Sequence, residues 1–162
     1  MKNYIFLLAL IFLSILGCKN DQSSNPTIVY VYSDPLIDSA AKVIVNRVID
    51  GDTFNIFVGT DSFSIRPLAI DAFEIKHDAR LDSQAVKAHI SIDSAYALGQ
   101  AGKLFADSLL SKKQVLLVRD YSQSNFDTYN RLLRHVYYFE NGVTHDYGAL
   151  MIAKGLALVD TL

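Results

Sequence analysis

The sequence predicts a small α+β domain in which strands predominate, and three observations support this. Short segments rich in β-branched residues and bounded by turn signals occupy residues 42–70 and 114–139, which is typical of strands. One longer segment with helical spacing, residues 93–113, separates these two groups. The chain has 162 residues, of which 51% are apolar, so it can bury one sizeable core.

Three strands are predicted in the first group. Residues 42–48 are β-branched and partly alternate between apolar and polar side chains. Residues 53–58 resume the strand pattern after Gly51, because a glycine there permits a bulge or a sharp bend. Residues 62–70 form the third predicted strand, in which Pro67 interrupts the ladder of hydrogen bonds.

A helix is predicted after the third strand, beyond a polar stretch. Residues 76–89 are polar, and their pattern does not indicate a particular element. In residues 93–113 the apolar side chains fall on one helical face, and Ser94 is the expected N-cap. Gly99 and Gly102 disfavour a helix in the first half of this segment.

The last part of the chain is predicted to add two strands and a short helix. The strands are residues 114–119 and 131–139, and the helix is residues 146–154, ended by Gly155. The order is therefore three strands, a helix, two strands and a helix. This is the pattern of a five-stranded OB-type β-barrel with a helix between strands 3 and 4 and a short C-terminal helix. The patterns alone establish only a small β-rich α+β domain, and the barrel prediction depends on the family resemblance given below.

Residues 1–17 predict an export signal. Lys2 supplies a positive charge, and the apolar run after it is too short to span a bilayer comfortably. The run ends in Leu-Gly before Cys18, the only cysteine, so a disulfide within one chain is excluded. This ending resembles the lipobox of bacterial lipoproteins, which implies that Cys18 is lipidated and anchors the protein to the membrane on the extracytoplasmic side of the bacterial envelope. The alternative is a simple signal anchor.

Residues 18–40 are expected to form a tether between the lipid and the folded domain. They begin with a polar Ser- and Asn-containing stretch, and residues 27–32 alternate enough to suggest a short strand. The folded domain is accordingly predicted to comprise residues 41–162. The formal net charge of −2 argues against non-specific binding of nucleic acid through bulk positive charge.

Three separated motifs carry the candidate chemistry. They read IDGDTF at residues 49–54, IRPLAIDAFE at residues 65–74, and FDTYNRLLRHVYY at residues 126–138. Taken singly, each has an ordinary explanation as a turn or a solvated polar segment. Together and in this order they resemble the thermonuclease family, the staphylococcal-nuclease-like phosphodiesterases. The resemblance covers residues 41–160 and includes the late segment ALMIAKGLA at residues 149–157.

The resemblance implies a calcium site built from oxygen ligands. Asp52 and Asp71 match the calcium-binding carboxylates, and the backbone carbonyl of Ala72 matches a further ligand. Asp50 matches an acidic neighbour of the site. Calcium is a hard cation that prefers oxygen ligands, and it can bridge a phosphate and its attacking water. Whether another divalent ion replaces calcium stays open.

The resemblance also implies how the phosphate and the water would be held. Arg66 and Arg131 match two phosphate-binding arginines, whose planar forks can donate two hydrogen bonds to a phosphate. Glu74 matches the glutamate that holds the attacking water and acts as general base. Tyr129 matches a tyrosine near the bound nucleotide.

One geometric difficulty remains in the second motif. Arg66 and Asp71 are five residues apart, and odd spacing along an ideal strand places side chains on opposite faces. We therefore expect Pro67 and the end of the strand to reorient one of them.

The chain departs from the family pattern around the motifs. Phe73 replaces the proline usual before the glutamate, so this loop is expected to be less rigid. Asn130 replaces the glycine before the second arginine, and asparagine tolerates positive φ better than most residues. Residues 78–92 are expected to form an extra loop beside the cleft.

A further departure concerns the end of the sequence. It stops where the family usually continues into a third helix, and Thr161 stands at the position of one nucleotide-contacting tyrosine. Weaker nucleotide binding and lower stability are the expected consequences.

The leading hypothesis is a monomeric, calcium-dependent endonuclease (a hydrolase) that acts on DNA or RNA at the cell envelope. The alternative is a non-catalytic OB-fold module that binds nucleic acid or protein at the membrane, because barrels of this type are often pure binders. A structural envelope lipoprotein is a third class. Retention of Glu74 together with both arginines favours the enzyme.

Overall fold

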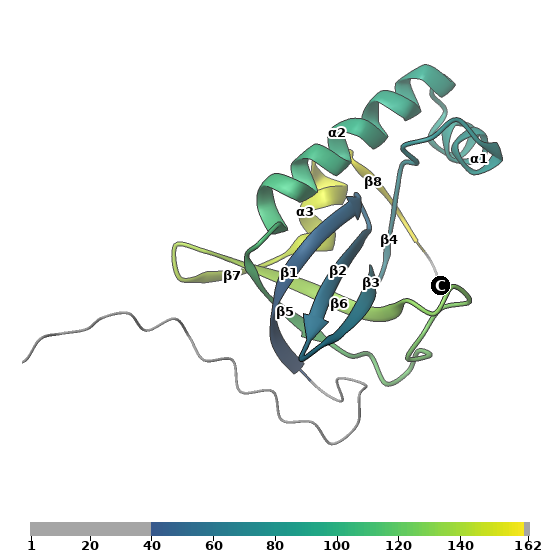
Figure 1. Cartoon of the computed structure of the whole chain (residues 1–162). Coiled ribbons are helices and arrows are strands. Elements are labelled where there is room, and N and C mark those ends of the chain that lie inside the picture. Colours follow the sequence, from purple (N-terminus) through teal and green to yellow (C-terminus); the bar gives the residue numbers. More distant parts are fainter. Residues whose placement is uncertain (1–39, 161–162) are drawn as a thin grey trace, which may run out of the picture.

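A closed barrel of five strands forms the centre of the fold in the computed structural model, which describes residues 40–160 (Figure 1). The barrel strands are β1 (Ala40–Asp50), β2 (Thr53–Val58), β3 (Asp61–Pro67), β5 (Gln114–Val118) and β6 (Leu132–Glu140). Neighbours pair in the order β3-β2-β1-β5-β6, and a parallel pairing between β3 and β6 closes the barrel. The predicted α+β class and OB-type barrel are confirmed.

The N-terminal predictions lie mostly outside the described residues. Residues 1–39 are not among the described residues, and they include the expected signal at residues 1–17, the lipidation site Cys18 and the suggested strand at residues 27–32. Thr161, near the C-terminal end, is also outside the described residues. β1 begins at Ala40, the last residue of the predicted tether.

The first strand bends sharply around the barrel. Its pairing with β2 shifts register between Val45 and Arg47 and again between Val48 and Asp50. Such bulges increase the local twist of a strand, which helps a small barrel to close. The second bulge lies directly before the turn between β1 and β2, where the first candidate motif is found.

The third strand ends earlier than the sequence predicts. We expected a strand over residues 62–70, but β3 ends at Pro67 and the chain turns through Ala69, which has a φ of 65°. A proline lacks the N–H that would continue the ladder, so the strand stops there. The short strand β4 (Ile70–Ala72) then pairs with β8 (Ala157–Val159).

The longest helix, α2 (Ile92–Leu110), packs against β1 and runs across one end of the barrel (Figure 1). Ser91 is its N-cap and accepts a hydrogen bond from the backbone N–H of Ser94, so the expected cap at Ser94 is wrong. Gly99 is needed for close packing, since a Cβ there would lie 2.2 Å from the carbonyl oxygen of Glu74. The glycine that weakens the helical pattern thus lets α2 approach the loop after β4.

An additional helix, α1 (Ala79–Ala88), occupies most of the expected loop at residues 78–92. Asp78 is its N-cap and accepts hydrogen bonds from the N–H groups of Arg80 and Leu81. Leu81 and Ala85 are buried and form a small apolar cluster with Phe73, which follows β4, and with Ala95 of α2. The loop prediction was wrong because the segment is polar on average, while its few apolar residues recur at helical spacing.

The C-terminal part completes one side of the barrel. β7 (Val143–Asp146) forms a hairpin with β6, and α3 (Tyr147–Ala153) follows, with Gly155 in the left-handed conformation just beyond it. The predicted short helix and its glycine stop are confirmed to within a residue. None of the helices within residues 40–160 combines the length and apolar character needed to cross a membrane.

Candidate active site

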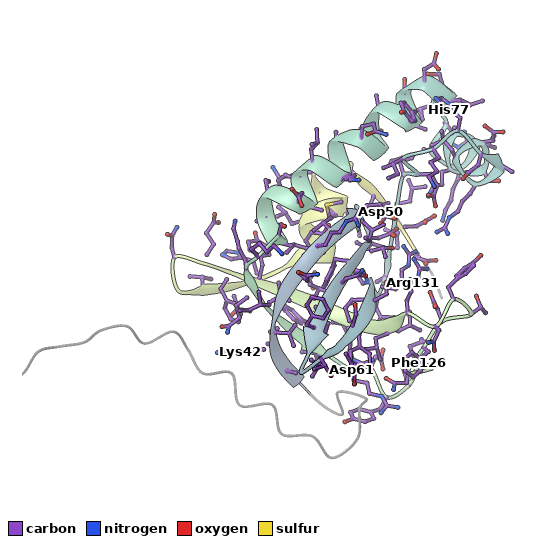
Figure 2. All side chains as sticks on the ribbon, viewed as in Figure 1. Lys42, Asp50, Asp61, His77, Phe126 and Arg131 are labelled. Carbon is purple, nitrogen blue, oxygen red and sulfur yellow. The ribbon has the colours of Figure 1, made fainter. Side chains whose placement is uncertain are left out.

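Five side chains singled out by the sequence converge toward one end of the barrel. They are Asp52, Arg66, Asp71, Glu74 and Arg131. Asp52 lies in the turn between β1 and β2, Arg66 at the end of β3, and Asp71 in β4. Glu74 follows β4, and Arg131 directly precedes β6. In Figure 2, Asp50 lies at the upper end of the barrel and Arg131 lies on its right-hand side, whereas Asp61 lies near the bottom.

Asp52 and Arg66 form a buried ion pair at the centre of the site. Each residue is only 6% exposed, and the Asp52 carboxylate pairs with Nη1 of Arg66. The same carboxylate accepts hydrogen bonds from the backbone N–H of Ala72 at 2.6 Å and from Oγ1 of Thr53 at 3.3 Å. Burying either charge alone would be costly, so each group requires the other. Asp52 also raises the pKa of Arg66 against the lowering effect of burial.

The turn glycine allows these segments to approach. A Cβ on Gly51 would lie 2.7 Å from Cβ of Ala72 and 3.1 Å from Cε of Met151. Its carbonyl oxygen accepts a hydrogen bond from the hydroxyl of Tyr147 at 2.6 Å. Gly51 is therefore required for the contact between the first motif and β4, in addition to any bend it permits.

The spacing difficulty between Arg66 and Asp71 is resolved by the turn after β3. Pro67 ends the strand, and the left-handed conformation of Ala69 starts β4 in a new direction. As a result, Nη2 of Arg66 lies 3.6 Å from Oδ1 of Asp71, on the same side of the site. The backbone N–H of Asp160 bonds to the Ala69 carbonyl, and its carboxylate lies 3.4 Å from Arg66.

Asp71 has a second cationic partner from outside the barrel. Nη2 of Arg80, on α1, donates a hydrogen bond to Oδ1 of Asp71 at 2.7 Å. Burial raises the pKa of Asp71, but hydrogen bonds from Arg80 and Gln84 and the charges of Arg80 and Arg66 outweigh it, so the pKa is lowered overall. Asp71 is therefore a carboxylate held in its ionised form.

Glu74 is positioned through its backbone as well as its side chain. Its N–H donates to Oε1 of Gln84 at 2.9 Å, while Nε2 of Gln84 donates to the Ala72 carbonyl at 2.8 Å. The preceding residue, Phe73, is buried in the α1 cluster. Burial raises the pKa of Glu74, and Nε of Arg80 lies 3.0 Å from its carboxylate.

Arg131 borders the site on the side of β6. Its Nε donates to Asp127 at 2.6 Å, and its Nη1 donates to Oγ1 of Thr53 at 2.9 Å. Thr53 in turn contacts Asp52, so a hydrogen-bonded chain links Arg131 to the buried carboxylate. Asn130 has a φ of 61°, as expected for the residue in the place of a glycine.

Tyr129 and Asp50 complete the set of predicted residues. Tyr129 is 75% exposed, and the guanidinium carbon of Arg131 lies 5.5 Å from the centre of its ring. Asp50 accepts a hydrogen bond from the backbone N–H of Asp52 at 3.0 Å. Burial, assisted by the Asp52 carboxylate, raises the pKa of Asp50 to about 6.

Sequence reasoning missed four polar groups of this site. They are Arg80, Gln84, Asp127 and Asp160. Arg80 and Gln84 share one side of α1, and the helical spacing of Leu81, Ala85 and Ala88 could have revealed that helix. Asp127 lies four residues before Arg131 in the same motif, and the turn between them brings the two side chains together. No local signal points to Asp160, which is 94 residues from Arg66.

The donor set suits a hard divalent cation. Asp52 and Asp71 both contact the Arg66 guanidinium, and the carbonyl of Ala72 lies beside Asp71 in the chain. All three supply oxygen atoms, which calcium and magnesium prefer. Within residues 40–160, no three Asp, Glu, His or Cys side chains are arranged to hold a metal.

Comparison with known proteins gives a distant relationship. The chain is similar to an uncharacterized protein of Methanocaldococcus jannaschii, with 27% identity over 172 aligned residues that cover 98% of this chain and 82% of the other. No protein-family model matches the chain. This similarity assigns neither a family nor an activity, so the function is argued from the site itself.

Proposed function

We propose that the protein is a calcium-dependent endonuclease of the thermonuclease type that hydrolyses phosphodiester bonds in DNA or RNA. The observation that carries this proposal is the convergence of Asp52, Asp71, Glu74, Arg66 and Arg131 at one end of the barrel. Carboxylates for a cation, arginines for a phosphate and a carboxylate for a water are the groups that this reaction needs.

The two arginines would bind the phosphate from different directions. Arg66 approaches from β3, where its ion pair with Asp52 fixes the guanidinium. Arg131 approaches from the segment before β6, where Asp127 and Thr53 hold it. Negative charge grows on the phosphoryl oxygens during hydrolysis, and each preorganised donor can stabilise that transition state by about 3 kcal/mol.

Glu74 would position the attacking water and accept its proton. The water oxygen bonds to phosphorus, the bond to the 5′ oxygen breaks, and that oxygen takes up a proton, which leaves the phosphate on the 3′ side. The hydrogen bond from the Glu74 backbone to Gln84 holds the carboxylate near the phosphate site. A calcium ion held by Asp52, Asp71 and the Ala72 carbonyl would supply Lewis-acid stabilisation of the phosphoryl group.

The competing proposal is a binding module without catalysis. The observation that favours it is internal charge neutralisation, since Arg80 pairs with both Asp71 and Glu74. A binder would use Arg131 and the exposed ring of Tyr129 to hold nucleic acid. The two proposals differ in whether a bound strand is cut.

Membrane anchoring is part of the proposal and rests on the sequence alone. The signal-like residues 1–17 and the following Cys18 support a lipid-anchored protein on the outer side of the cytoplasmic membrane or in the outer envelope. Mass spectrometry of protein produced in bacteria tests this: a diacylglyceryl mass on Cys18 is expected, and an unmodified mature N-terminus would contradict it.

The decisive experiment incubates the purified protein with plasmid DNA and with RNA, in calcium or in excess chelator. We expect cleavage with calcium and none with chelator, with products that carry a 3′ phosphate. Glu74→Gln should abolish cleavage while leaving the fold intact, because the backbone bond to Gln84 does not involve the carboxylate.

The matched control is Asp61→Asn, the same acid-to-amide change at the opposite end of the barrel (Figure 2). It should leave cleavage unchanged. Binding without cleavage would instead support the binding module. Absence of both binding and cleavage would support a structural role.

A further inference from the structure

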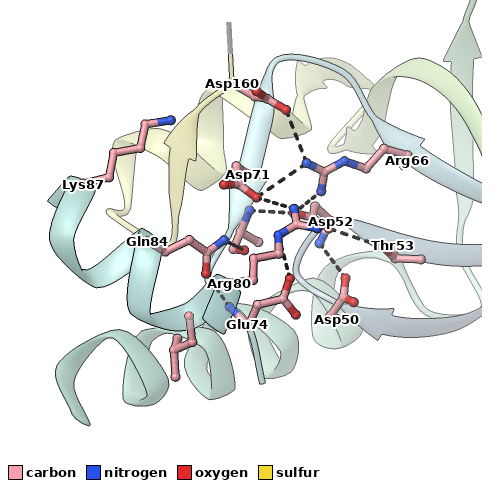
Figure 3. A network of polar contacts seen from close by, with 12 residues as sticks. Asp50, Asp52, Thr53, Arg66, Asp71, Glu74, Arg80, Gln84, Lys87 and Asp160 are labelled. Carbon is pink, nitrogen blue, oxygen red and sulfur yellow. Dashed lines mark hydrogen bonds and ion pairs between the residues drawn. The ribbon is translucent and has the colours of Figure 1, made fainter. Parts of the chain in front are cut away.

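The guanidinium of Arg80 lies among the carboxylates proposed to serve the cation and the water. Its Nη2 is 2.7 Å from Oδ1 of Asp71, and its Nε is 3.0 Å from Oε1 of Glu74. Figure 3 shows this guanidinium between Asp71 and Glu74, close to Asp52. The negative charge of Asp52 also contributes to raising the pKa of Arg80.

Arg80 reaches this position because of helix α1. The residue stands in the first turn, which the Asp78 cap holds in place, while Leu81 anchors the helix in its apolar cluster. One turn further on, Gln84 bonds to the backbone of the site. A segment that was expected from the sequence to be only a loop thus forms a helix and brings a positive charge to the site.

Arg80 differs from Arg66 in how firmly it is held. The Arg66 side chain is 7% exposed and has Asp52 as a buried partner, whereas the Arg80 side chain is 43% exposed. Arg80 is therefore already partly hydrated and can exchange its partners for water easily. Arg66 cannot, because that would leave the buried carboxylate of Asp52 without its partner.

A guanidinium bound to a carboxylate weakens the binding of a divalent cation to that carboxylate, and the exposed guanidinium of Arg80 is the one that the cation can displace. Oδ1 of Asp71 is the acceptor for Arg80, and Asp71 is also a proposed calcium ligand. We propose that Arg80 is an intramolecular counter-cation that competes with the divalent cation for Asp71 and therefore sets the affinity of the site. This inference rests on the proposed calcium site, and it adds that cation binding displaces Arg80 and frees Glu74.

Two measurable consequences follow from this competition. Without Arg80 the cation does not have to break two charge-assisted hydrogen bonds, so it should bind more tightly. Without Arg80 and without the cation, Asp52, Asp71 and Glu74 have one counter-charge fewer, so the protein should unfold at a lower temperature.

The experiment compares the purified full-length protein with Arg80→Gln, in detergent because of the apolar N-terminal segment. Isothermal titration with calcium should give a dissociation constant at least about tenfold lower for Arg80→Gln. Thermal unfolding should show a lower midpoint than wild type in chelator and a larger upward shift on addition of calcium.

Lys87→Gln is the matched control. Lys87 lies on the same helix and its change removes the same charge, but its ammonium contacts the backbone carbonyl of Val159 at 3.3 Å and no carboxylate of the site. Its calcium affinity should stay within about twofold of wild type, because the interaction with the site is screened. An equal gain in Lys87→Gln would overturn the proposal in favour of a general charge effect.

Arg80→Lys provides a second test if Arg80→Gln does not fold. An ammonium keeps the charge but lacks the planar fork that spans Asp71 and Glu74, so calcium affinity should rise severalfold. Unchanged calcium affinity in the folded Arg80 variants, with wild type still binding calcium and cleaving DNA, would overturn the counter-cation role alone. Absence of calcium binding in wild type and variants would overturn both this inference and the proposed calcium dependence.

Discussion

The barrel core and the small apolar cluster under α1 hold opposite sides of the candidate site, and they differ in extent. The barrel core is continuous across β1, β2, β3, β5 and β6, and it includes fully buried residues such as Val43, Ile56 and Leu117. The α1 cluster has only four buried members, namely Phe73, Leu81, Ala85 and Ala95.

This difference separates the site into a firmly held side and a more adjustable one. Asp52 and Arg66 project from barrel elements and are themselves buried. Glu74 and Arg80 depend on the smaller cluster and are partly exposed. Elements with few buried apolar contacts open at a lower free energy than the core of a domain. We expect the α1 side to respond to ligands while the barrel side stays in place.

The largest effect is expected from Arg66→Ala, which leaves Asp52 buried without its ionic partner. Removal of one partner of such a pair typically lowers the free energy of unfolding by about 3–5 kcal/mol. Chemical denaturation monitored by circular dichroism measures this loss. The control Arg47→Ala, at an exposed position of β1, should stay within about 0.5 kcal/mol of wild type.

Leucine truncation in each cluster compares the two regions directly. Leu117→Ala in the barrel and Leu81→Ala in α1 remove the same atoms from fully buried positions. We expect losses of about 4 and about 2 kcal/mol respectively, because the smaller cluster can collapse around the cavity more easily. Hydrogen exchange should show faster exchange confined to α1 in Leu81→Ala. Equal losses, with exchange increased throughout the molecule, would contradict the division into two regions.

A smaller effect is expected from Gln84→Ala, which removes two hydrogen bonds across the boundary between the regions. The Glu74 N–H and the Ala72 carbonyl would lose their partner, at a cost of about 1–3 kcal/mol. The cleavage rate should also decrease, and by more than the fraction of unfolded protein explains, because the Glu74 backbone loses its hydrogen bond to Gln84. Gln100→Ala, which removes one bond to the Ile75 carbonyl, should cost about 1 kcal/mol and serves as the comparison.

The local patterns of the chain were sufficient to locate the strands of the barrel, whereas their closure into an OB-type barrel was predicted with the help of the family resemblance. β-Branched segments and glycine or proline punctuation located the barrel strands and the helices α2 and α3, because strand and helix periodicity are properties of neighbouring residues. The ends of elements were less accurate. Ser91 rather than Ser94 caps α2, and Pro67 ends β3 completely, since caps and strand ends depend on which hydrogen-bond partners the fold provides.

The sequence by itself determined the α+β class, the order of the strands, and the motif residues that became candidates for the site. Only the tertiary structure decided how these residues meet. The left-handed turn at Ala69 aligns Asp71 with Arg66, and the missing side chain of Gly51 lets the turn before β2 touch Ala72. α1 places Arg80 between two carboxylates. Contacts between distant segments depend on packing in three dimensions, which local residue patterns do not encode.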